Sequence, residues 1–136
     1  MFLNQIKTDI KYLFLDLCQQ MSLVDEVLHH EEKAIMKAYC REMDVPEDYL
    51  DEDEEIALDD ILQRLTEKAD ESEKKIILLE LLGLAKIDGT FDNNEKRLLN
   101  YIADKFRLEP KAVKELEDLL DEYYEVYQRL YNTVFA

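Results

Sequence analysis

The sequence predicts an all-α protein, and three observations support this fold class. Only two glycines and two prolines occur in 136 residues, and alternating β-branched runs are absent, so long helices are favoured over strands. Apolar residues recur at intervals of three and four along most of the chain. The apolar fraction of 47% is high enough for a hydrophobic core. We therefore expect one domain, residues 1–136, folded as a single-domain helical bundle of about six helices.

The central stretch, residues 76–108, predicts an apolar helix, a short acidic turn and a second, amphipathic helix. Asp88-Gly89 is a strong helix breaker, because glycine accepts positive φ angles. Asp92 precedes Glu95 by three residues, which is the spacing of a capping box. Both carboxylates also oppose the helix macrodipole. They therefore have a structural role at the start of a helix whether or not a metal binds there.

The first half of the chain contains a weaker version of the same plan. A shift of 63 residues (88 − 25 = 63) aligns the apolar positions of the two halves without a gap. The acidic residues that match under this shift are Asp25 with Asp88 and Glu32 with Glu95. We interpret residues 3–45 and 73–108 as two helix-turn-helix repeat units related by a pseudo-two-fold axis.

The remaining helices follow from apolar spacing and from breaker residues. The expected helices are 3–22, 30–43, 56–65, 73–87, 93–106 and 110–132. Asp70 or Ser72 is the expected N-cap of the fourth of these. Gly83 lies inside that helix at a cost in stability, for which close approach of another helix provides a reason. Pro110 takes the favoured first-turn position of the last helix.

An acidic connector, residues 44–60, separates the second and third expected helices. It carries ten carboxylates and no basic residue. A run of like charges is typical of a solvated connector. The alternative is a segment that attracts cations or binds a protein partner.

The charge of the chain limits its partners. A formal net charge of −16 disfavours nucleic acids and anionic membranes, since phosphate binding needs Lys and Arg. A protein with a basic surface is the natural partner. No signal peptide and no apolar run long enough to span a membrane is present, so we expect a cytoplasmic protein. Cys18 and Cys40 are then expected to be reduced and buried.

The C-terminal helix, residues 110–132, is rich in tyrosine. Its predicted apolar face comprises Val113, Leu116, Leu120, Tyr123, Tyr127, Leu130 and Tyr131, with Tyr124 and Phe135 to the side. This face is either part of the core, with hydroxyls reaching the surface, or an aromatic docking patch. In the second case it forms a homodimer or binds another partner.

Two groups of side chains are candidate metal ligands. The first comprises Asp88, Thr90, Asp92, Glu95, Asp25 and Glu32. Hard cations such as Ca²⁺ or Mg²⁺ prefer such oxygen ligands, although helix capping and solvation explain the same residues. The alternating acids of an EF-hand loop are absent. His29 and His30 are a candidate Zn²⁺ or Ni²⁺ pair or, alternatively, exposed turn residues.

No catalytic arrangement is evident in the sequence. There is no phosphate-binding loop, and no Ser/His/Asp or Cys/His set has a suggestive spacing. We therefore expect a protein that is not an enzyme.

The turn and its flanking helices resemble the TerB-like family, which is named for a tellurite-resistance protein. The residues that carry the resemblance are Ala85, Asp88, Gly89, Phe91, Asp92, Glu95, Leu98, Leu99, Ile102, Ala103 and Leu108. The resemblance implies an all-helical domain with pseudo-two-fold related halves, an acidic region that holds a divalent metal, and links to stress-response complexes near the membrane. We expect a non-catalytic cytoplasmic binding module of a stress or tellurite response, with a weak divalent-cation site. The alternative is an acidic protein–protein interaction domain without a metal.

Overall fold

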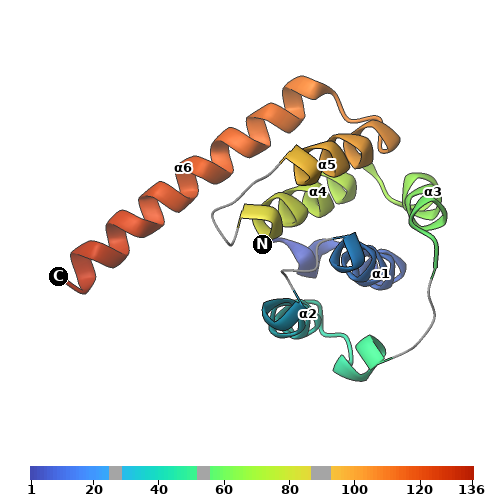
Figure 1. The fold of residues 1–136 in the computed structure, drawn as a ribbon, viewed down its shortest axis with the longest axis horizontal. Coiled ribbons are helices and arrows are strands. Elements are labelled where there is room, and N and C mark those ends of the chain that lie inside the picture. The colour runs from blue at the N-terminus through green and yellow to red at the C-terminus, as the bar shows by residue number, and fades with distance from the viewer. Residues whose placement is uncertain (25–28, 52–55, 87–92) are drawn as a thin grey trace. The chain divides into compact units, whose positions relative to one another are not determined.

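The computed structural model describes residues 1–24, 29–51, 56–86 and 93–136, and of residues 22–24 and 29–32 it describes the backbone alone (Figure 1). The α-helices are α1 (Thr8–Val24), α2 (His29–Met43), α3 (Leu58–Lys68), α4 (Glu71–Lys86), α5 (Asn93–Lys105) and α6 (Pro110–Val134). The described residues also form two short 3₁₀ helices, η1 (Leu3–Gln5) and η3 (Glu47–Asp51). The described residues form no strand, so the all-α prediction is confirmed, as is the number of helices.

None of the helices in the described ranges combines the length and the apolar composition needed to cross a membrane. The chain divides into two compact units, Met1–Ile77 and Leu78–Ala136, with the division inside α4. The sequence predicts that residues 1–136 form one domain, and this stays a prediction.

The core of the first unit is built around α1. Figure 1 shows α1 beside both α2 and α3, and residues of α1 contact both helices. Phe14 of α1 is fully buried, and its ring meets the ring of Tyr39 edge to face, with centroids 5.2 Å apart. The buried residues of α3 are Ile61, Leu62 and Leu65. They share one face of that helix, as the predicted spacing requires.

The acidic connector packs partly on α1. The Tyr49 hydroxyl in η3 donates a hydrogen bond of 2.7 Å to Asp16 Oδ1. The Tyr49 ring also lies 4.7 Å from the ring of Tyr12, between centroids. The first part of the connector is therefore attached to the core of its unit and does not lie wholly in solvent.

Glu73 joins the starts of α1 and α4. Asp70 and Glu73 form a capping box, because the Glu73 amide donates to Asp70 Oδ1 at 2.8 Å and the Asp70 amide donates to Glu73 Oε1 at 3.1 Å. The Lys7 amide, directly before α1, donates to Glu73 Oε2 at 2.8 Å. The Lys7 ammonium pairs with the same carboxylate. The sequence predicted a continuous helix from Leu3, but α1 begins at Thr8, where this distant carboxylate caps it.

The ends of α2 and α5 share one backbone motif. Asp44 and Arg107 both adopt a left-handed conformation with a φ of 56°. The next residue then bonds back into the helix, through Val45 N–H to Cys40 C=O at 2.8 Å and Leu108 N–H to Ala103 C=O at 3.1 Å. The offset, 107 − 44 = 63, equals the shift that aligns the two halves of the sequence. This agreement favours the repeat, while the pseudo-two-fold relation between the units stays a prediction.

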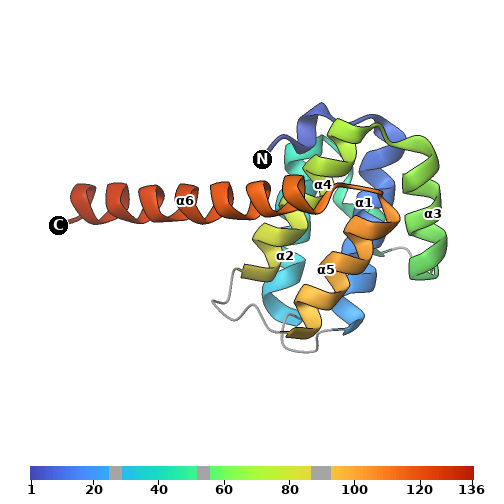
Figure 2. The ribbon, with the colours of Figure 1, turned by 90° about the horizontal axis from the view of Figure 1, so that it is seen from above.

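The second unit comprises the C-terminal part of α4 together with α5 and α6. Lys86 of α4 reaches α6, where its ammonium lies 2.6 Å from Asp121 Oδ1 and 3.4 Å from Glu117 Oε1. A Cβ added at Gly83 would lie 3.1 Å from the Tyr124 hydroxyl. The approach expected at Gly83 is therefore made by a side chain of α6. Beyond these contacts, the second half of α6 extends away from α4 and α5 (Figure 2).

Candidate protein-interaction surface

Most of the predicted cation ligands lie outside the described residues. These are Asp25, Asp88, Thr90 and Asp92, and for Glu32 only the helical backbone of α2 is described. Glu95 lies partly buried in the first turn of α5. Within the described ranges, no group of three or more His, Cys, Asp or Glu residues could hold a metal ion. The predicted Ca²⁺ or Mg²⁺ site, like the Zn²⁺ or Ni²⁺ reading of His29 and His30, stays a prediction.

If the turn binds Ca²⁺, then Asp88→Asn should abolish the stabilisation that Ca²⁺ adds beyond ionic-strength-matched NaCl. For a dissociation constant near ~0.1 mM, 1 mM Ca²⁺ stabilises the folded state by about 1.4 kcal/mol. Thermal unfolding of the two proteins measures this difference. Asp53→Asn, in the acidic connector, is the control and should respond to Ca²⁺ like the unmutated chain. Equal responses of the unmutated protein to Ca²⁺ and to NaCl would leave capping as the only role of these residues.

The two thiols have the environment of structural cysteines. Cys18 and Cys40 are buried and neither takes part in a disulfide, as the sequence predicted. Burial raises the pKa of the Cys40 thiol, and the charge of Glu47 raises it further. A protonated, buried thiol is a poor nucleophile, so Cys40 is unsuited to catalysis.

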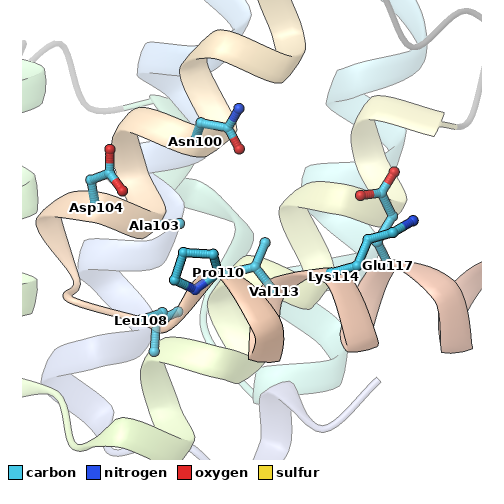
Figure 3. Close-up of a pocket in the computed structure, with 8 residues that line it drawn as sticks. All are labelled: Asn100, Ala103, Asp104, Leu108, Pro110, Val113, Lys114 and Glu117. Atoms are coloured by element: carbon cyan, nitrogen blue, oxygen red, sulfur yellow. The ribbon is translucent and has the colours of Figure 1, made fainter.

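A cleft of about 400 Å³ lies between α5 and α6 (Figure 3). Its lining residues are Asn100, Ala103, Asp104, Leu108, Pro110, Val113, Lys114 and Glu117. The only basic group among them, Lys114, pairs with Asp118 at 2.8 Å, and this hydrogen bond raises the pKa of Lys114. The lining includes no Ser, Cys or His that a neighbouring base could activate.

The largest exposed apolar feature in the described part of the chain lies on α6. Leu120, in the first half of the helix, is buried, whereas residues 121–136 are all exposed. We define the α6 apolar surface as the exposed large apolar residues of this helix and the residue that follows it: Leu119, Tyr123, Tyr124, Val126, Tyr127, Leu130, Tyr131, Val134 and Phe135. The five aromatic side chains among them are between 39% and 71% exposed. Together with the four aliphatic side chains they expose on the order of 800 Å². The largest patch on a typical monomer is ~300–600 Å².

The rings of the α6 apolar surface pack on one another along the helix. Tyr123 stacks on Tyr127 with centroids 6.5 Å apart, and Tyr131 lies 4.8 Å from Phe135. At the inner end, partial burial raises the pKa of Tyr124, and the nearby charge of Glu80 raises it further. Aromatic rings that already pack on one another along the helix lose less conformational freedom when a partner covers them.

The sequence identified this helix but left its role open between a core face and a docking patch. The core-face reading holds for Leu120, which is buried, but not for Tyr123, Tyr127 and Leu130, which are exposed. For this exposed part the docking patch stays a prediction. Leu119, Val126 and Val134 also belong to the exposed surface and were missed. The sequence contained a signal for them. Leu119 and Val126 lie beside the predicted face and Val134 continues it, and the charged residues between 119 and 134 all lie on the opposite side of the helix.

Comparison with protein-family models, with curated proteins and with solved structures gave no match. The resemblance to the TerB-like family therefore stays a prediction from the sequence.

Proposed function

We propose that this protein is a non-catalytic interaction module that binds one amphipathic helix of a protein partner on the α6 apolar surface. The observation that carries the proposal is the exposure of nine large apolar side chains on α6 and the residue that follows it, eight of them beyond the buried Leu120. Exposed apolar surface of this size is typical of an interaction site.

The spacing of these residues favours a helix as the bound element. From Val113 to Val134 the apolar positions alternate in steps of three and four, through Leu116, Leu120, Tyr123, Tyr127 and Leu130. This is the 3.5-residue period with which one helix packs along another. In the first half of this seam Val113 and Leu116 are partly buried and Leu120 is buried, which leaves the second half for the partner.

The TerB-like resemblance adds a wider setting to this proposal. It supports a cytoplasmic role in a stress or tellurite response, and it rests on the residues of the turn and of its two flanking helices. The basic partner expected from the net charge of −16 also stays a proposal. The α6 apolar surface itself carries no charge that would select such a partner.

A photo-crosslinking amino acid at position 127 tests the proposed function in native extract. Benzoylphenylalanine in place of Tyr127 should crosslink to one defined helix of a partner, because this position is exposed in the middle of the surface. The matched control places the same amino acid at Gln128, which is also exposed but points to the polar side of α6. Mass spectrometry identifies the crosslinked peptides. Equal crosslinking from positions 127 and 128, or none from 127, would overturn the proposal.

A further inference from the structure

We propose that the helix bound on the α6 apolar surface is α6 of a second copy of this chain, running antiparallel. This inference rests on the proposed function and names its partner. It follows from the distribution of charge on α6, from the pairing of residue sizes along its seam, and from the area that two chains would cover.

The charged residues of α6 avoid the apolar surface. From residue 119 to residue 134, every position beside or within the seam is Leu, Tyr, Val or Thr. The charged residues in this range are Asp121, Glu122, Glu125 and Arg129, and all of them fall on the opposite side of a 3.5-residue repeat. Two acidic chains can therefore bring these faces together without placing carboxylates in the interface. A strongly basic partner would find no carboxylate there to pair with.

The charges along the helix favour the antiparallel orientation. Acidic residues occur in the inner part of the exposed segment, up to Glu125, whereas residues 130–136 carry none. In a parallel pair each of these carboxylates would lie level with the same carboxylate of the second chain. In an antiparallel pair Glu122 and Glu125 lie level with uncharged residues of the second chain. The antiparallel arrangement also opposes the two helix macrodipoles.

The seam is complementary to itself when reversed. Its exposed positions read Tyr123, Tyr127, Leu130 and Val134. With Tyr127 of one chain level with Leu130 of the other, Tyr123 comes level with Val134, since 127 + 130 = 123 + 134. Each tyrosine then packs against an aliphatic side chain in all four layers. A parallel pair would instead place each ring against the same ring of the second chain.

The area is sufficient for a dimer of moderate affinity. Each chain exposes on the order of 800 Å² on this surface, so partial coverage of both chains removes roughly 1,000 Å² from water. That value is near the lower bound for a specific interface. The net charge of −16 on each chain opposes association over long range. Added salt screens this repulsion, so the dimer should become tighter as the NaCl concentration rises.

Sedimentation equilibrium of the purified full chain tests the inference. We expect a monomer–dimer equilibrium whose dissociation constant rises at least about tenfold in Tyr127→Glu and in Leu130→Glu, because each buries a carboxylate in the seam. The matched controls, Gln128→Glu and Asn132→Glu, add the same charge on the polar side and should change it less than about threefold. Circular dichroism verifies that all variants fold. A monomer at every concentration, or equal effects of seam and control variants, would overturn the inference.

The orientation is tested with spin labels on single cysteines, at Glu122→Cys and at Gln128→Cys. The native thiols are buried and react slowly. In the antiparallel register residue 128 lies level with residue 129 of the second chain, so the two labels at 128 lie nearly level. Residue 122 lies level with residue 135, so the two labels at 122 are offset by 13 residues, or about 20 Å along the axis. Pulsed electron resonance should therefore report a much longer distance at 122 than at 128. Equal distances would indicate a parallel pair and overturn the proposed orientation.

A monomeric chain that still crosslinks from position 127 to another protein would overturn the inference and retain the proposed function.

Discussion

Phe14→Ala should lower the free energy of unfolding by about 3–5 kcal/mol, the largest loss that we expect from a single substitution in this chain. Phe14 is fully buried in α1 and makes an edge-to-face contact with Tyr39. The substitution removes a ring from the centre of the first unit and leaves a cavity that rigid helices on either side cannot close. A loss of this size is a large fraction of the stability of a small protein. Urea denaturation followed by circular dichroism measures it.

Phe2→Ala is the matched control for Phe14. The substitution is chemically the same, but the Phe2 side chain is exposed. Its effect should lie within about 0.5 kcal/mol. If the two variants lose similar amounts of stability, the packing of α1 at the centre of its unit is wrong.

Glu73→Ala should cost about 2–4 kcal/mol, because one buried carboxylate satisfies the first turns of two helices. Glu73 is only 4% exposed and accepts hydrogen bonds from the Lys7 and Asp70 amides. Its removal leaves both amides without an acceptor in a partly buried site. Urea denaturation again measures the loss. Lys7→Met is the control, since it removes the exposed ammonium and keeps the backbone bonds, so it should cost much less.

The contribution of Glu73 should depend on pH in a defined direction. Burial alone would raise the pKa of Glu73, but the hydrogen bonds from Lys7 and from the Asp70 amide lower it below its usual value of 4.5. A lowered pKa in the folded state means that the stabilisation is present above pH 4.5 and is lost as the pH falls below it. The difference in unfolding free energy between the unmutated chain and Glu73→Gln should therefore shrink below that pH. A difference that is constant from pH 7 to pH 3 would contradict this account.

Local signals in the sequence predicted most of the helices. Asp70 with Glu73 has the spacing of a capping box and caps α4, and Pro110 begins α6 as expected. The start of α1 could not be predicted in the same way. It depends on a carboxylate 66 residues away, which no local pattern of residues 1–10 contains. The attachment of Tyr49 to α1 is a tertiary contact of the same kind.

The candidate site shows a second limit of sequence reasoning. Tyr123, Tyr127 and Leu130 have the same period as Leu116 and Leu120, because a helix face looks alike whether its own chain or another chain covers it. Periodicity therefore located the apolar face, but it could not show whether the same chain or another chain covers that face. The absence of charge on and beside the face from residue 119 to residue 134 was the additional signal.

The central claim is that the second half of α6, whose side chains are exposed in the described part of the chain, is covered only on binding. Hydrogen–deuterium exchange of the dilute protein tests this most directly. An unsupported helix end opens at little free-energy cost, whereas amides in a packed core exchange only through larger unfolding. We therefore predict fast exchange for residues 125–134 and slow exchange for residues 99–103 of α5, where Leu99, Ile102 and Ala103 are buried. Strong protection of residues 125–134 in the dilute monomer would show that its own chain covers this surface, and would contradict the account.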